Sequence, residues 1–125
     1  MSIDVNVQAL GGFATAAAVT ANNVANSNTP GFKQSRTEFE TGPDGEGMRV
    51  GSIDVDNSPG PAIPASGLPE DGGPARLAPG LIEGSNTDIG TQMVDLGLVQ
   101  NAYAANVAAV RTQDQLAGTV LDMIA

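Results

Sequence analysis

The middle of this chain is too rich in glycine and proline to be helical. Between residues 41 and 86 there are ten glycines and seven prolines. In a helix interior each glycine costs about 1 kcal/mol and each proline about 3 kcal/mol relative to alanine. Both flanks have few such residues and a helical spacing of apolar positions. We therefore divide the chain into a helix and turn at 1–33, a middle segment at 34–86, and a second helix at 87–125.

The N-terminal segment predicts an amphipathic helix from Ile3 to Asn26, because its apolar positions alternate steps of four and three. Beyond Asp4 it has no charged residue before Lys33. The helix therefore has no charged face toward solvent. This favours a helix surrounded by other protein over an ordinary buried helix of a monomer. Its predicted apolar seam consists of Ile3, Val7, Leu10, Ala14, Ala17, Ala21 and Val24.

The C-terminal segment continues the same spacing over five heptads, starting at about Thr87. Asn86 or Thr87 can cap its start, and Asp88 in the first turn suits the helix dipole. Gln100 and Asp114 interrupt the stripe, where they either fix the register or face solvent. Its seam residues are Ile89, Met93, Leu96, Tyr103, Val107, Val110, Leu121 and Ile124.

A column of small residues runs beside each seam, and its members are Gly11, Ala18 and Ala25 in the first helix and Gly90, Gly97, Ala104 and Gly118 in the second. Interior glycines cost about 1 kcal/mol each relative to alanine. We therefore expect another backbone to approach these columns closely. The alternative is that they are weak helix positions without a purpose.

The predicted fold is mainly α, with the two heptad helices forming an antiparallel coiled coil. The second predicted helix is longer than the first by about 15 residues, each of which adds 1.5 Å of length. Part of its apolar stripe therefore extends beyond the first helix. That stripe needs partners from other subunits. Contacts between non-equivalent surfaces of neighbouring copies propagate as a helical filament.

The middle segment is expected to contain loops and a short β element. Met48–Asp56 is the best strand candidate, and its alternation slips between Val50 and Ile53. A bulge at Gly51 or Ser52 explains that slip.

The remainder of the middle segment is predicted to be irregular. Phe32–Phe39 suits an extended arm, and Ser58–Gly80 a loop or polyproline-like linker. Gly42–Gly47 and Asp54–Ser58 superficially match phosphate and calcium loops, but two acids in the first and Pro59 after the second favour turns. Most acidic residues lie in this segment, where a solvated surface is favoured over a cation site.

Composition excludes several classes of protein. A net charge of −9 argues against binding nucleic acid or anionic membranes. The absence of cysteine and histidine removes disulfides, the usual zinc sites and the Ser–His and Cys–His couples. No apolar run reaches the roughly 18 residues of a membrane span, and the start lacks the basic region of a secretory signal.

We predict no catalytic, cofactor-binding or metal-binding residue, because Lys33, Tyr103 and the carboxylates form no recognisable motif.

The first helix is expected to end in a run of asparagines followed by a turn. Asparagine and serine side chains compete for backbone hydrogen bonds, and Pro30 lacks a donor. Gly31 permits positive φ, so Thr29–Phe32 suits a type II turn.

Asn22 to Lys33 reads Asn-Asn-Val-Ala-Asn-Ser-Asn-Thr-Pro-Gly-Phe-Lys and resembles the N-terminal signature of bacterial flagellar rod and hook proteins, the axial proteins of the basal body. Glu83–Ile89, Gln92–Leu96 and Gln100–Asn106 resemble the C-terminal signature of the same family, with departures at Thr87, Gln92 and Asn101. The signature positions are Asn22, Asn23, Asn26, Thr29, Pro30, Gly31, Phe32, Ser85, Asn86, Asp88, Tyr103 and Asn106. The short middle segment is most similar to the small proximal rod proteins.

The resemblance implies a structural subunit of the flagellar basal-body rod, exported by the flagellar type III apparatus without a cleaved signal peptide and polymerised in the periplasm through its terminal helices. Implied partners are other rod proteins, copies of itself and the export apparatus, without direct membrane insertion. We expect the termini to be at least partly disordered in a free monomer. The alternative class is a non-catalytic coiled-coil binding module or export adaptor in the cytoplasm. An enzyme is a third alternative.

Overall fold

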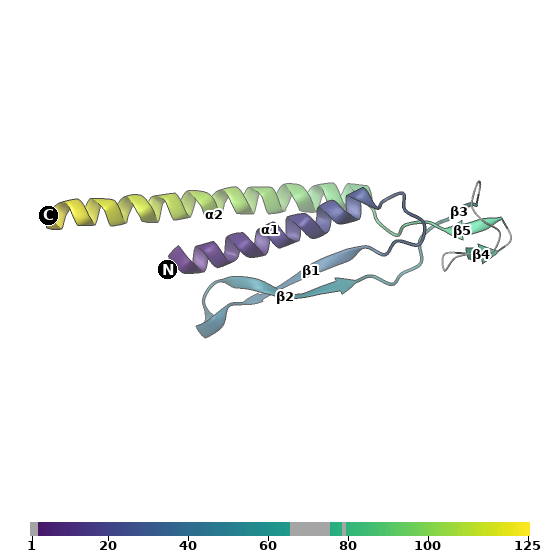
Figure 1. The fold of residues 1–125 in the computed structure, drawn as a ribbon, viewed down its shortest axis with the longest axis horizontal. Helices are drawn as coiled ribbons and strands as arrows, with labels where there is room; N and C mark the ends of the chain where they lie inside the picture. Colours follow the sequence, from purple (N-terminus) through teal and green to yellow (C-terminus); the bar gives the residue numbers. More distant parts are fainter. Residues whose placement is uncertain (1–2, 66–75, 79) are drawn as a thin grey trace.

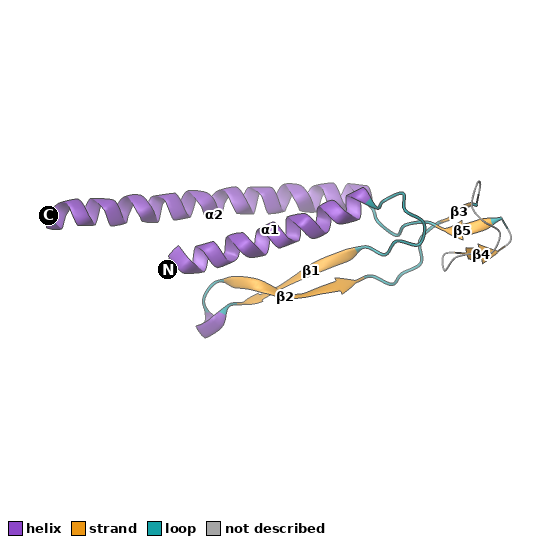
Figure 2. Cartoon of the chain, viewed as in Figure 1, coloured by secondary structure: helices purple, strands orange, loops and turns teal. Residues whose placement is uncertain are grey.

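The computed structural model describes residues 3–65, 76–78 and 80–125. Within these residues the chain forms two long helices, one at each end, and short strands between them (Figures 1 and 2). The elements are α1 (Ile3–Ala25), β1 (Ser35–Thr41), a 3-10 turn (Pro43–Gly45), β2 (Met48–Val55), β3 (Ala62–Pro64), β4 (Arg76–Ala78), β5 (Leu81–Glu83) and α2 (Ile89–Ile124). The prediction of two terminal helices with a short β element between them is confirmed, and the structure adds that the strands pair antiparallel.

The two helices lie side by side and run in opposite directions. Asn6, near the start of α1, is hydrogen-bonded to Asn106 and Gln113 in the second half of α2. Asn23, near the end of α1, bonds to Gln92 in the first turn of α2. α1 also contacts both strands of the β1–β2 hairpin, so it lies between the hairpin and α2 (Figure 1).

α2 is the longer helix and extends beyond the start of α1 (Figure 1). Its residues 114–124 are all exposed. We call this segment the overhang. It is shorter than the predicted excess of the second helix because α1 reaches as far along α2 as Gln113.

The hairpin contains the predicted bulge. β1 and β2 pair antiparallel with Glu38 opposite Ser52 and Phe39 opposite Val50, which leaves Gly51 without a partner. The predicted strand 48–56 is therefore β2, one residue shorter. Gly42–Gly47 forms the hairpin loop, as expected, but Asp54 belongs to β2 and not to a turn.

A second sheet corrects the expectation of a loop over residues 58–80. β3, β5 and β4 form a small antiparallel sheet in that order. Three-residue strands are too short to show an alternating pattern, so pairing with β5 stabilises them without a local signal. The part of the predicted linker at 66–75 and 79 lies outside the described residues.

The apolar core of the described chain is very small. Ala16 and Ile82 are its buried apolar residues. Phe13 of α1 meets Phe39 of β1 edge to face, with ring centroids 6.0 Å apart. A Cβ on Gly12 would lie 3.1 Å from Met48 Cε, so this glycine brings the hairpin close to α1. Five buried side chains are polar instead, namely Asn6, Thr20, Asn23, Ser85 and Gln92.

The two helix boundaries next to the middle segment differ in how well they were predicted. Gly31 has φ 73° and Phe32 N donates to Thr29 O at 3.2 Å, which matches the predicted type II turn. α2 starts at Ile89, two residues later than the predicted Thr87. Asp88 is the N-cap, and its side chain accepts from Gly90 N, whereas Asn86 is engaged elsewhere.

Candidate functional site

The end of α1, the hairpin and the start of α2 meet in a network of amide side chains. We call Asn23, Gln34, Asp56, Asn86 and Gln92 the polar junction. Asn23 is its most buried member, with 1% of its surface exposed. Its Nδ2 donates to Ser35 O at 2.7 Å and Gln92 Oε1 at 2.9 Å, and its Oδ1 accepts from Ser35 N at 2.9 Å. One side chain thus holds the end of α1 against both β1 and α2.

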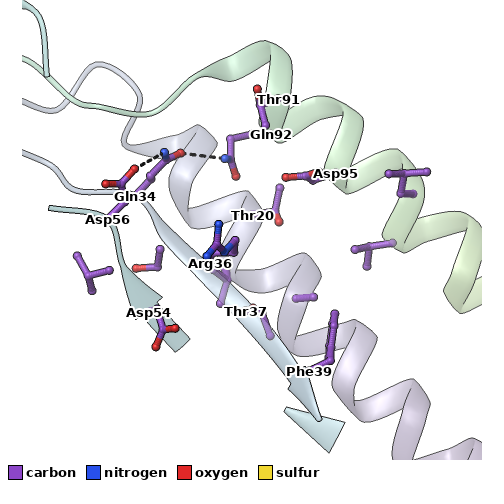
Figure 3. A pocket seen from close by; sticks show the side chains of 16 residues that line it. Thr20, Gln34, Arg36, Thr37, Phe39, Asp54, Asp56, Thr91, Gln92 and Asp95 are labelled. Atoms are coloured by element: carbon purple, nitrogen blue, oxygen red, sulfur yellow. Dashed lines mark hydrogen bonds between the residues drawn. The ribbon is translucent and has the colours of Figure 1, made fainter. Parts of the chain in front are cut away.

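The network continues from Gln92 across the junction (Figure 3). Gln92 Nε2 donates to Gln34 Oε1 at 3.0 Å, and Gln34 Nε2 donates to Asp56 Oδ2 at 3.1 Å. Asn86 closes the ring: its Oδ1 accepts from Gln34 N at 2.7 Å and its Nδ2 donates to Asp56 O at 2.8 Å. Buried amides stabilise a fold only when their hydrogen bonds are made, and here each amide has partners.

An ion pair ties the signature turn to the small sheet. Lys33 Nζ donates to Glu83 Oε1 and, at 2.8 Å, to Ser58 O. Glu83 also accepts from two backbone amides, Gly60 N on its carboxylate and Gly31 N on its carbonyl, both at 2.8 Å. The turn, the start of β3 and β5 are therefore connected at one point.

The junction carboxylate Asp56 and the ion-paired carboxylate Glu83 are both stabilised in their ionised form. Hydrogen bonds from the Ser58 hydroxyl, the Ser58 amide and Gln34 lower the pKa of Asp56 to about 2. The Lys33 hydrogen bond and the Gly60 amide lower the pKa of Glu83. Groups whose pKa is lowered on folding contribute stability above their unfolded pKa, near 4, and lose it as the pH falls through the folded pKa.

We therefore expect the junction to open between about pH 4 and pH 2. The Ser58 amide, which donates to Asp56 Oδ1 at 2.9 Å, should report this opening in an NMR titration. Asp56→Asn should remove the titration at Ser58. Asp44→Asn, in the hairpin loop, is the matched control and should leave it unchanged. A titration at Ser58 that survives Asp56→Asn would contradict the assignment.

A second polar contact holds the other end of α1 to α2. Asn106 Nδ2 donates to Asn6 O at 2.6 Å, and Asn6 Nδ2 donates to Gln113 Oε1 at 2.9 Å. Of these residues the sequence pattern singled out Asn106 alone. Asn6, Thr20, Gln34, Asp56 and Gln113 were missed. For Asn6 and Thr20 the available signal was an uncharged polar residue on a helix with no charged face.

The signature residues fall into two groups in the structure. Asn23 and Asn86 belong to the junction, while others order the turn: Asn26 Nδ2 donates to Asn22 O at 2.9 Å, and Thr29 Oγ1 donates to Asn26 Oδ1 at 3.0 Å. Ser85 Oγ accepts from Thr87 N at 3.1 Å and leads into the Asp88 cap. Pro30 and Tyr103 are exposed.

None of the predicted seam residues is buried in the single chain. Six seam residues are half-buried, namely Leu10, Ala17, Val24, Leu96, Val107 and Val110. Those that are exposed are Ile3, Val7, Ala14, Ala21, Ile89, Met93, Tyr103, Leu121 and Ile124. α1 instead packs through Gly12, Ala16 and polar residues. Nine of the fifteen predicted seam residues are therefore exposed and six are half-buried in the single chain.

The small-residue columns are also open. A Cβ added to Gly11, Gly97 or Gly118 would meet no other atom within 4 Å. The close backbone approach expected at these glycines is therefore not made inside this chain.

Within the described residues, no three His, Cys, Asp or Glu side chains are grouped so that they could hold a metal ion. Neither helix in the described part combines the length and hydrophobicity of a membrane-crossing segment.

Both ends of the chain match known families. Residues 3–33 match the flagella basal body rod protein family, and residues 78–123 match the C-terminal family of flagellar basal body rod FlgEFG proteins. The flagellar basal-body rod protein FlgG of Borreliella burgdorferi is 33% identical over 69 residues, which cover 55% of this chain and 26% of that protein. The match thus spans about a quarter of the relative's length. Because the two matches together cover both helices and both signatures, the chain belongs to the bacterial flagellar basal-body rod protein family.

Proposed function

We propose that this chain is a structural, non-catalytic subunit of the flagellar rod, exported by the flagellar type III apparatus and polymerised in the periplasm through its terminal helices. The observation that carries the proposal is the outward apolar stripe, none of whose seam residues is buried in the single chain. The three-part division at 1–33, 34–86 and 87–125 and the seam itself are part of the proposal.

Burial supplies the driving force for assembly. Ile89, Met93 and Leu121 are 48%, 54% and 67% exposed, and a fully buried side chain of this size contributes about 1.5–3 kcal/mol. With a core of two buried apolar residues in its described part, the single chain buries little apolar surface. Packing the stripes of neighbouring copies or of other rod proteins in coiled-coil fashion would bury them, and non-equivalent contacts of this kind build helical filaments.

The distribution of charge supports the same arrangement. Residues 34–88 hold ten of the fourteen acidic residues and three of the five basic ones. The helices are therefore nearly neutral, and copies can pack through them without strong like-charge repulsion. The acidic middle segment would then face solvent on the outside of the assembly.

Gly97→Leu tests the proposal directly. In the isolated chain we expect helicity to stay the same or rise, because glycine costs about 0.8–1 kcal/mol relative to alanine, leucine is close to alanine as a helix former, and the site is open. In the bacterium that encodes the chain, we expect loss of swimming and of the chain from purified basal bodies, since a neighbouring backbone could no longer approach. Ala108→Leu, at an exposed α2 position outside the seam and the small-residue column, is the control and should swim. A closed low-order oligomer with no basal-body incorporation of the unmodified chain would favour the adaptor instead.

A further inference from the structure

A groove of about 670 Å³ runs beside α1, between α2 and the hairpin (Figure 3). The junction residues Gln34 and Gln92 lie at one end of the labelled site and Phe39 toward the other. Its volume is as large as that of the pockets in which proteins bind small molecules, about 300–1,000 Å³. No seam residue lines it, so it is a surface separate from the one proposed for polymerisation.

The walls of the groove are apolar and incompletely covered. Phe39 contacts Phe13, so the hairpin face that carries Phe39 is turned toward α1, and the strand register places Val55 on the same face. An inward face is normally buried, yet Phe39 and Val55 are 41% and 53% exposed, and Leu98 on the opposite wall is 63% exposed. α1 therefore leaves uncovered a strip of apolar surface that another element could fill.

The rim of the groove is acidic. Asp54, Asp56 and Asp95 line it together with one cation, Arg36. Arg36 already pairs with Glu38 at 2.5 Å. Asp54 and Asp95 have no cationic partner among the residues that the structure describes. An occupant that brought positive charge would therefore be favoured at close range.

A second copy of this chain is poorly suited to that role. Among the cations whose side chains are described, Lys33, Arg36 and Arg49 are paired within the chain, which leaves Arg111. The exposed helix ends of a second copy carry acids instead. Asp4 lies at the start of α1, and Asp114 and Asp122 lie near the end of α2.

We propose that the groove docks a helix of a different protein, one with an apolar stripe flanked by lysine or arginine. The groove is lined by side chains of two helices and of the hairpin, so recognition is through side chains, as when an amphipathic helix lies in a hydrophobic groove. The apolar stripe would cover Phe39, Val55 and Leu98, and the flanking cations would meet Asp54 and Asp95.

A synthetic helical peptide with a leucine stripe and flanking lysines is the probe, and the same peptide with glutamates is its control. In NMR titrations of the isotope-labelled chain, the lysine peptide should shift the amide signals of Val19, Val55 and Leu98 and bind at least about tenfold more tightly than the glutamate peptide. Equal affinities, or shifts centred on the overhang, would overturn the proposal.

Matched variants separate the groove from overall charge. Asp54→Asn with Asp95→Asn should weaken binding of the lysine peptide about tenfold. Asp44→Asn with Glu46→Gln removes the same charge at the hairpin loop and should change it by about twofold or less. An equal loss in both double variants would show attraction to net charge alone and overturn the assignment.

Photo-crosslinking in the living bacterium identifies the occupant. A crosslinking amino acid in place of Leu98 should capture a basic, apolar helix of another chain, and capture of a second copy or of nothing would overturn the inference. The same amino acid in place of Leu116 on the overhang reports on the proposed rod contacts. A crosslink to axial neighbours at 116 with none at 98 would leave the proposed function intact.

Discussion

Ending the chain after Gln113 should abolish rod assembly and swimming while the rest of the molecule keeps its fold. Every residue removed is exposed, and the last hydrogen bond between α1 and this part of α2 is made by Gln113 itself. The overhang carries Leu121 and Ile124, which are 67% and 78% exposed. Their burial against a neighbour would contribute about 1.5–3 kcal/mol each, and the loss would recur at every subunit of a filament.

Point variants make this prediction sharper. Leu121→Asp with Ile124→Asp places two charges on the apolar stripe and should stop swimming as completely as the truncation. Gln115→Asp with Thr119→Asp adds the same charges to the same segment at polar positions and should leave swimming largely intact. The measurements are swimming in soft agar and the amount of chain in purified basal bodies, with circular dichroism of each isolated variant. If the truncated chain restored swimming to a strain without the native chain, the overhang would have no part in assembly.

Asn23→Ala should have the largest effect of any single substitution on the fold itself. It leaves the Ser35 amide, the Ser35 carbonyl and Gln92 Oε1 without the bonds they make to Asn23. Each buried polar group left unpaired costs about 1–3 kcal/mol, so a loss of roughly 3 kcal/mol in the free energy of unfolding is expected. For a small domain that is a large share of the total stability.

Hydrogen exchange at the Ser35 amide gives the most direct readout, because this amide donates to Asn23 Oδ1 at 2.9 Å. Asn23→Ala should make this amide exchange far faster and lower the urea midpoint of the isolated chain. Asn101→Ala is the matched control, since Asn101 is exposed on α2 and alanine is a better helix former there. Unchanged protection of Ser35 in Asn23→Ala would mean that the backbone of the junction is held by other contacts.

Local structure was predictable where a local cause exists. The spacing of apolar residues located both helices to within two residues of α1 (Ile3–Ala25) and α2 (Ile89–Ile124). The slipped alternation narrowed the bulge to Gly51 or Ser52, of which the structure has Gly51, and the proline and glycine at 30–31 located the turn. In each case steric or periodic constraints act over a few residues, so a single stretch of sequence contains them.

The small sheet and the start of α2 were missed for the opposite reason. β3 and β4 are stabilised by pairing with β5, and three residues contain no periodic signal. Asn86 looked like a helix cap, but its side chain bonds to Gln34 N and Asp56 O. Because the Asn86 side chain makes these tertiary hydrogen bonds, the N-cap of α2 is Asp88.

By itself, the sequence determined two helices, each with an apolar stripe, a non-helical middle segment and the turn that ends the first helix, because helix propensity, proline and glycine act locally. Only the tertiary structure decided which face of α1 is buried, and it buried Asn23 and Thr20 while leaving the stripe outward. The bond from Asn23 to Gln92 joins residues 69 positions apart. No pattern within either helix predicts such a bond, since its energy depends on both partners being brought together and shielded from water.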